Sequence, residues 1–390
     1  MENKHAPQPE KQPEQINQIN IMEQSTEPNV IPSRIRAKKK PKWFYPTLGL
    51  ALAIVIIGIY YVYAILDSMN KIHKDPDDSR FKAVQDDESP PPPVWEGKDR
   101  VNILLMGADA RGMKKNEIPR SDSMIIASID PVSKKATLFS ILRDTYGVIP
   151  KFGNDRINAA IIYGGPQLAM QTVSELTGLP IQYYVYTDFQ GFIALIDALG
   201  GIDFEVEKRM RWKDSHDDPI YHIDLQPGMQ HMDGKTALAY VRFRHDALSD
   251  YTRTLRQRNF LSAIAEKLKT TSSLLKLPML LDSVVPHVET NLGLEDMLKL
   301  AALGFSVDTK SIATVQLPPT ELLVEKKVNG AEVIAIRDGA NIPAYVQEQL
   351  DAQAAAAAEE ELAKDDPVND GANVETGATN SSEKNTENTR

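Results

Sequence analysis

Arginine and aspartate occur together at four places along the chain. The segments are GADAR (Asp109, Arg111), RSD (Arg120, Asp122), LRDT (Arg143, Asp144) and YVRFRHDALSDYTRTLRQR (Arg242, Arg244, Asp246, Asp250, Arg253, Arg256, Gln257, Arg258). A planar guanidinium binds phosphate oxygens in pairs, and aspartate supplies the hard oxygen ligands that Mg²⁺ prefers. Together these groups suit phosphoryl transfer, because they neutralise phosphate charge and orient the attacking oxygen. A single Arg–Asp pair is also a common surface ion pair of little consequence.

The first three pairs each stand at the end of a predicted strand. The strand signals are the short apolar and β-branched runs VNILLMGA, SMIIASID and ATLFSIL. In open α/β sheets ligands bind at strand ends, so the pattern indicates one shared phosphate site rather than scattered pairs.

The turn after the first run resembles a phosphate-binding loop in outline only. Gly107 and Gly112 have the spacing of G-x-x-x-x-G-K-[ST], but Met113 stands where the lysine belongs. We therefore expect this turn to offer the Asp109 carboxylate to a metal rather than backbone N–H groups to a phosphate.

The arginine-rich segment continues into a predicted helix, Tyr251 to Leu268. Arg253, Arg256 and Gln257 are three and four residues apart, so they share one face that could close a phosphate pocket. A solvated helical face remains an alternative. A nucleic-acid patch is not expected, because this segment is predicted to lie outside the membrane, as argued next.

An uncharged apolar run, PTLGLALAIVIIGIYYVYAIL (residues 46–66), is long enough to cross a hydrocarbon core of about 30 Å. The basic segment RIRAKKKPK precedes it, which places the N-terminus in the cytoplasm and the rest of the chain outside. A cleaved signal peptide is the alternative. The length of the run, its late start and the lack of a small-x-small cleavage site argue against it.

Composition divides the chain into five parts. We expect a disordered cytoplasmic tail with a basic flank (1–45), a transmembrane helix (46–66), an extracellular Pro-rich stalk (67–98), one catalytic domain (99–350) and an acidic disordered tail (351–390). Within the last part, AQAAAAAEEELAKDD can extend a helix. The absence of cysteine excludes disulfides, thiolate metal sites and a thiol nucleophile.

Strand and helix signals alternate within the domain. PVSKK between two strand runs suits an antiparallel pair, Asp188 is placed to cap a helix, and Asn329-Gly330 indicates a hairpin. The glycine pairs 164–165 and 200–201 are interpreted as helix stops. The alternation predicts an α/β fold, an α/β/α three-layer sandwich with a mixed central sheet. Motifs of serine hydrolases and zinc proteases are missing, and His222 and His231 as metal ligands are a minor alternative.

The order LLMGADAR, RSDSMIIASIDPVSKKATLFSILRDT, RINAAIIYGG, YVYTDFQGFIALIDALGGIDFEV and DGKTALAYVRFRHD resembles the LytR–CpsA–Psr family over roughly residues 99–270. The resemblance implies a membrane-anchored extracytoplasmic enzyme that binds a polyprenyl pyrophosphate in an apolar tunnel. Such enzymes transfer anionic glycopolymers, for example wall teichoic acid, from the lipid carrier to peptidoglycan.

The resemblance also assigns roles. Asp109 and Asp122 match metal-associated aspartates, for Mg²⁺ or Mn²⁺. The (pyro)phosphate-binding candidates are Arg120, Arg143, Arg242, Arg244, Arg253, Arg256 and Gln257, and the catalytic candidates are Asp250, Arg143 and Asp144, with Asp250 activating the acceptor hydroxyl. Two positions depart from the family pattern. Leu142 replaces a usual proline, which questions the rigidity of its loop, and Ile161 replaces a usual aromatic residue, which could reshape the tunnel.

Two other functions stay open. One is a non-catalytic sensor or regulator of lipid-linked cell-wall precursors, and the other is a polyprenyl pyrophosphate hydrolase. The expected partners are the lipid-linked glycopolymer, peptidoglycan and the membrane, with no nucleic acid; the sequence does not indicate an oligomeric state.

Overall fold

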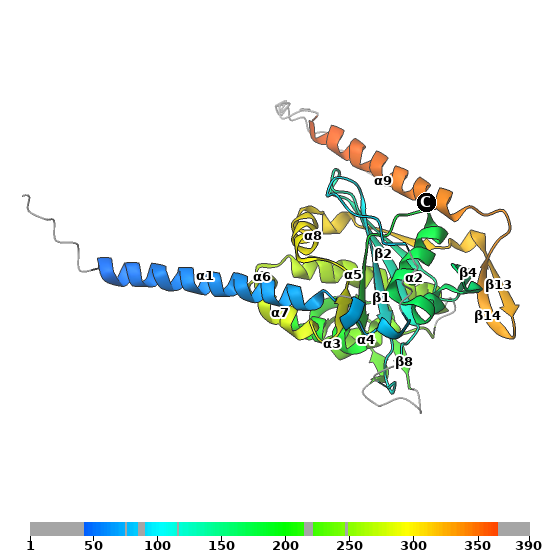
Figure 1. Ribbon diagram of the computed structural model, residues 1–390, viewed down its shortest axis with the longest axis horizontal. Coiled ribbons are helices and arrows are strands. Elements are labelled where there is room, and N and C mark those ends of the chain that lie inside the picture. The colour runs from blue at the N-terminus through cyan, green and yellow to red at the C-terminus, as the bar shows by residue number, and fades with distance from the viewer. Residues whose placement is uncertain are drawn as a thin grey trace, which may run out of the picture. The chain divides into compact units, whose positions relative to one another are not determined.

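The computed structural model describes residues 43–74, 76–84, 90–114, 117–213, 221–245 and 249–365. The expected tail 1–45 and the end of the expected tail 351–390 therefore fall almost entirely outside the described residues. The chain divides into two units, residues 1–55 and 56–390. The second unit carries the folded domain shown in Figure 1.

A six-stranded sheet forms the centre of this domain, in the order β11-β6-β1-β2-β3-β12. Its strands are β1 (Val101–Ala108), β2 (Ser121–Ile129), β3 (Ala136–Ile141), β6 (Tyr183–Asp188), β11 (Val288–Thr290) and β12 (Ala313–Leu317). β1–β2, β2–β3 and β6–β11 are antiparallel, whereas β1–β6 and β3–β12 are parallel. The mixed sheet and the antiparallel pair around PVSKK are as predicted.

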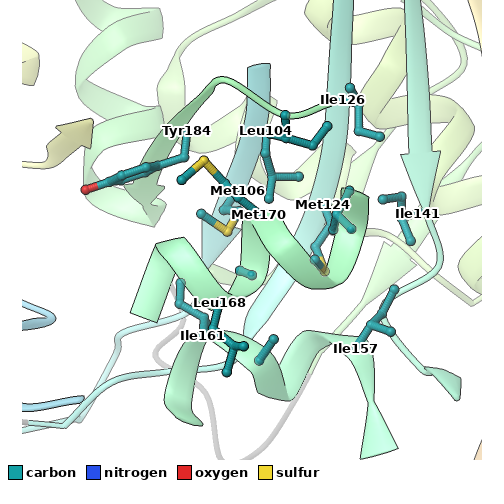
Figure 2. Close-up of a cluster of buried hydrophobic side chains, with 14 of the residues drawn as sticks. Leu104, Met106, Met124, Ile126, Ile141, Ile157, Ile161, Leu168, Met170 and Tyr184 are labelled. Atoms are coloured by element: carbon teal, nitrogen blue, oxygen red, sulfur yellow. The ribbon is translucent and has the colours of Figure 1, made fainter. Parts of the chain in front are cut away.

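Alternation along the strands gives the sheet two apolar faces. Leu104 and Met106 of β1 pack with α2 (Ala160–Thr177) and α9 (Ile342–Asp365) on one face. Figure 2 shows this core, with Leu168 and Met170 of α2 against the strands. The other face is covered by α3 (Phe189–Ala198), α5 (Ser249–Leu268) and α8 (Leu294–Ser306), with α4 (Gly234–Arg242) and α7 (Leu277–Val284) packed on α3. The three-layer α/β/α sandwich is confirmed.

Local signals explain several element ends. The Asp188 carboxylate accepts from the N–H of Gly191 and caps α3, and Gly200 and Gly201 follow that helix with positive φ. The other glycine pair also interrupts a helix, as predicted. Gly164 and Gly165 have non-helical backbone angles, so α2 consists of two helical parts joined at a kink, and the second part begins at Pro166.

Three smaller sheets accompany the central one. β4 (Thr145–Ile149), β5 (Gly153–Arg156), β13 (Leu323–Val328) and β14 (Ala331–Ile336) form a four-stranded sheet, with β13–β14 the expected hairpin. β7 (Ile202–Val206) pairs with β10 (Gly228–Met232), and β8 (Met210–Trp212) pairs with β9 (Ile223–Leu225). The short helix α6 (Thr271–Leu275) joins α5 to α7.

The segment expected to be a stalk differs from that expectation. α1 (Phe44–Ile72) runs beyond residue 66, and its end packs on the domain, where Met69 and Ile72 are buried. Phe81 and Trp95, within the expected stalk 67–98, are buried in two apolar clusters of the domain. Residue 350 lies inside α9, and residues 351–365 continue this helix, in line with the helical signal of AQAAAAAEEELAKDD. Burial of apolar side chains, which the local composition does not show, accounts for the difference in the stalk.

α1 is the one helix in the described part of the chain that is long and apolar enough to cross a membrane. Within its span Tyr45–Ile72, an 18-residue window has a mean hydropathy of 2.4 and is fully exposed.

Candidate phosphate and lipid site

A cavity of about 720 Å³ lies between the second face of the sheet and helices α3, α4, α5 and α7. Much of its wall is apolar. The apolar lining includes Leu105, Ile125, Val185, Phe192, Leu195, Leu238, Phe260, Leu261, Ile264, Val284 and Val288. A cavity of this size and lining is suited to an extended apolar ligand.

Another part of the wall is charged or polar. It includes Asp109, Arg111, Asp122, Arg143, Arg242, Arg244, Arg253 and Gln257. Helix α5 contributes to both parts, because Arg253 and Gln257 precede Phe260, Leu261 and Ile264 along its cavity-facing side. The cavity thus offers one end to anionic groups and the other to a hydrocarbon chain.

Arg143 is the centre of the charged end. Its Nη1 donates to Asp122 of β2, and its Nε lies 3.4 Å from Asp144 Oδ2 and 3.5 Å from Asp250 Oδ2. Burial alone would lower the pKa of Arg143, but the three carboxylates outweigh burial and raise it. The guanidinium is therefore a permanent cation fixed between β2, β3 and α5.

Asp250 lies in the first turn of α5, between two arginines. Its Oδ2 accepts from Nη2 of Arg253 at 3.2 Å and faces Arg143. Burial lowers the pKa of Arg253, since Asp250 only partly offsets the loss of hydration. Both contacts use Oδ2, and a carboxylate accepts through two oxygens, so neither ion pair has to open before Asp250 can accept a proton from a hydroxyl.

Asp144 acts through its arginine neighbours rather than in the cavity wall. Its two oxygens face Arg143 Nε and Arg156 Nη1, the latter at 3.2 Å, and its carbonyl accepts from the N–H of Ile334. These contacts suit a residue that positions Arg143 better than the catalytic residue that the sequence predicted.

Asp109 is paired with Arg111 of the same turn. Arg111 Nε donates to Asp109 Oδ1 at 2.7 Å, and its guanidinium stacks over Phe189 and Tyr221 at 5.2 and 4.3 Å from the ring centroids. Arg242 stacks over the same two rings, at 5.0 and 5.5 Å. Two cations therefore share an aromatic support at the charged end.

The donor set fits a magnesium ion shared with a phosphate ligand. Asp109 and Asp122 both line the cavity, and two carboxylates with substrate oxygens are a common Mg²⁺ environment. Within the described ranges, no group of three or more His, Asp or Glu side chains could hold a metal by itself. The protein would thus provide part of a coordination shell rather than a complete cage.

Comparison with known proteins decides the family. The family model described as LytR_cpsA_psr family matches residues 59–349. The chain belongs to the LytR–CpsA–Psr family.

Relatives in this family carry a specific activity in their names. The chain is similar to the polyisoprenyl-teichoic acid–peptidoglycan teichoic acid transferase TagU of Oceanobacillus iheyensis, with 32% identity over 299 residues, 73% of this chain and 88% of the relative. It is equally similar to TagT of Bacillus subtilis, which bears the same activity name, with 32% identity over 291 residues and the same coverage.

Solved LytR–CpsA–Psr structures have the same fold. A structure of TagT bound to LI-WTA superposes with a TM-score of 0.53 at 28% identity, covering 68% of this chain and 95% of that one. TagT with bound octaprenyl pyrophosphate lipid gives 0.50 at 26% identity, with the same coverage.

The two departures from the LytR–CpsA–Psr pattern have structural outcomes. Leu142 is fully buried, and its N–H donates to the carbonyl of Leu317 at 2.9 Å, a bond that proline could not make. The loop is therefore fixed by hydrogen bonds. Ile161 does not reshape the cavity, because it is buried in the core on the opposite face of the sheet.

Arg256 and Arg120 do not line the cavity, which argues against their assignment to the phosphate set. Arg256 is 4% exposed and turned away, with Nε donating to Glu207 at 2.7 Å and Nη1 to the carbonyl of Phe243 at 2.8 Å. The face of α5 toward the cavity holds Arg253 and Gln257, and Arg256 lies beside it. Arg120 Nη1 is buried without a hydrogen bond, next to Asp155.

Sequence reasoning missed the aromatic part of the charged end. Trp212, Tyr221 and His245 line the cavity, and the Trp212 and His245 rings stack with centroids 3.4 Å apart. Aromatic residues spaced around the arginine-rich segment were the available signal. His231 instead pairs with Asp203 at 2.8 Å on the surface.

Proposed function

We propose that this protein transfers an anionic glycopolymer, of the wall teichoic acid type, from a polyprenyl pyrophosphate carrier to a hydroxyl of peptidoglycan. The observation that carries this proposal is the cavity itself, in which a cluster of arginines ends an apolar channel of the right chemistry for a prenyl chain. The activity named for TagU and TagT, and the octaprenyl pyrophosphate bound by TagT, support it.

The charged end would hold the pyrophosphate. Arg143 and Arg253 supply guanidinium forks for its oxygens, Gln257 and Arg244 lie in the same wall, and the prenyl chain follows α5 past Phe260 to Ile264. Binding replaces the present carboxylate partners of the arginines with phosphate oxygens.

The reaction is a displacement at phosphorus. The acceptor hydroxyl oxygen attacks the phosphorus that carries the glycopolymer, its proton passes to Asp250, and a phosphodiester to peptidoglycan forms. The bond to the bridging oxygen breaks, and the lipid leaves with its own phosphate. Arg143 and Arg253 stabilise the charge that develops on the phosphate oxygens.

Asp109 and Asp122 would hold the metal, which when bound adds positive charge next to the pyrophosphate. Asp109 must first release Arg111, whose stacking on Phe189 and Tyr221 keeps it close by.

We place the N-terminus of α1 in the cytoplasm and the domain outside the cell. The basic segment before α1 supports this orientation. Peptidoglycan is on that side of the membrane.

The test uses the full chain in lipid nanodiscs with a lipid-pyrophosphate-linked disaccharide, peptidoglycan oligomers and Mg²⁺, analysed by mass spectrometry. We expect a phosphodiester-linked acceptor that Arg143→Ala removes. Arg209→Ala is the matched control, because Arg209 also pairs with an aspartate, Asp224, but outside the cavity. Release of the disaccharide phosphate to water, with no adduct, would show a hydrolase instead. Tight lipid binding with no product would show a sensor.

A further inference from the structure

Helices α6 and α7 leave large apolar side chains exposed. Leu275 is 73% exposed and Met279 is 56% exposed, with the exposed Lys276 between them. Exposed apolar residues next to lysine are typical of segments that lie in a membrane interface.

The same two helices run beside the end of α1. The hydroxyl of Tyr61 donates to the carbonyl of Leu274, and Lys71, ten residues later in α1, is close enough to Asp282 to interact electrostatically. From Tyr61 to Lys71 along α1, the partner changes from Leu274 to Asp282, so α1 and the α6–α7 segment run in the same direction. Leu275 therefore lies at the level of Tyr61, and the end of α7 lies at the level of Lys71.

The length of the apolar run sets the depth of Tyr61 in a bilayer. At about 1.5 Å per residue, residues 46–60 alone would span roughly 22 Å, less than a hydrocarbon core of about 30 Å. The first charge after the run is Asp67. Tyr61 must therefore lie within the outer boundary of the bilayer, where the exposed Tyr60 and Tyr63 suit an aromatic belt.

We propose that α6 and the first turn of α7 dock into the outer surface of the bilayer. Leu275 and Met279 enter the lipid, and Lys276 contacts anionic headgroups. The surface formed by Leu275, Lys276 and Met279 is therefore covered by the membrane that α1 spans, because the contact of the adjacent Leu274 with Tyr61 keeps it at the level of the bilayer surface.

This docking orients the cavity. The cavity-facing residues of α5 change from Arg253 to Ile264 toward the end that leads into α6, and α7 contributes Val284 to the cavity wall. The apolar end thus lies toward the bilayer and the charged end away from it. If the ligand is a prenyl pyrophosphate, as the proposed function requires, its prenyl chain would enter beside α7 while its pyrophosphate reaches Arg143.

The absence of cysteine allows specific labelling of the full chain. Leu275→Cys and Met279→Cys would carry an environment-sensitive fluorophore in liposomes of phosphatidylglycerol and phosphatidylethanolamine. Val324→Cys, exposed on β13, is the control. We expect nitroxide lipids to quench the labels at 275 and 279 while iodide in the buffer does not, and the reverse at 324.

Iodide quenching at 275 equal to that at 324 would overturn the proposal. Shielding of 275 from both quenchers would also overturn it, because a second protein copy would then cover the face.

A second measurement separates docking from function. Leu275→Asp should lower transfer from a long-chain donor in vesicles several-fold, and leave transfer from a short-chain donor in detergent unchanged. Equal loss with both donors would contradict the proposed entry path. If the proposed function fails, no variant shows transfer, but the quenching pattern still tests the docking.

Discussion

Nε of Arg143 lies 3.5 Å from Oδ2 of Asp250, across the junction between the end of β3 and the start of α5. The same carboxylate oxygen accepts from Arg253. One carboxylate thus aligns two cations at the charged end of the cavity, and the pair joins the two elements that form its walls.

Asp250→Asn tests whether this carboxylate accepts the proton of the acceptor. We expect transfer to fall by at least about 100-fold, the usual contribution of a general base. Lipid binding should change little, because the amide oxygen can still accept from Arg253. Transfer rates by mass spectrometry and lipid affinity by fluorescence would be measured together. A variant with native transfer would leave Asp250 with a positioning role only.

Removal of divalent cations tests the metal assignment. We expect EDTA to weaken binding of the lipid pyrophosphate by about tenfold, or ~1.4 kcal/mol. In Asp109→Asn and Asp122→Asn this dependence on Mg²⁺ should disappear. Asp130→Asn is the control, since Asp130 pairs with Arg100 away from the cavity. Equal Mg²⁺ dependence in all four proteins would place the metal elsewhere.

Leu261→Trp should fill the apolar part of the cavity. Because Leu261 lines it, the added ring should weaken long-chain lipid binding by about tenfold or more, in line with the cost of overpacking. Leu255→Trp on the same helix is the control, as Leu255 is 43% exposed and outside the lining. Titration with labelled prenyl pyrophosphates would compare the two. Equal affinities would show that the chain binds elsewhere.

Arg256→Met tests the reassignment of Arg256 from phosphate ligand to structural residue. Loss of the hydrogen bonds to Glu207 and Phe243 should lower the free energy of unfolding by about 1–3 kcal/mol, with Glu207 discounted for its partial exposure. Urea unfolding would measure this. The folded variant should keep lipid affinity, whereas Arg253→Met should lose it; a similar loss in both would restore Arg256 to the site.

Sequence signals of short range predicted much of this fold. The Asp188 cap, the turn between β2 and β3 and the Asn329-Gly330 hairpin each depend on residues a few positions apart. They were therefore visible without knowledge of the tertiary structure. The charged end was predicted in outline, since Arg143 and Asp122 stand at strand ends that the sheet brings together.

Long-range packing decided the rest. Arg253 and Arg256 have the same local pattern, and only the position of Glu207 and Phe243 shows which one turns from the cavity. Tyr221 reaches the site through β8 and β9, a pairing without a strong local signal. Phe81 stands between two charged residues, and Trp95 stands between a proline-rich run and Glu96. These polar or extended surroundings gave no sign that either ring is buried.

His73 pairs with Thr290 at the edge of the central sheet, directly after α1. Phe81 and Trp95 then fasten the following residues to the domain. A free chain of residues 67–98 could extend roughly 100 Å. Because this segment is attached to the domain at these points, it cannot extend in that way. With the proposed orientation, the domain stays close to its membrane anchor and reaches only a short distance into the wall. On the proposed function, it modifies the glycan strands nearest the membrane, which fixes the attached polymer at the innermost layer of the wall.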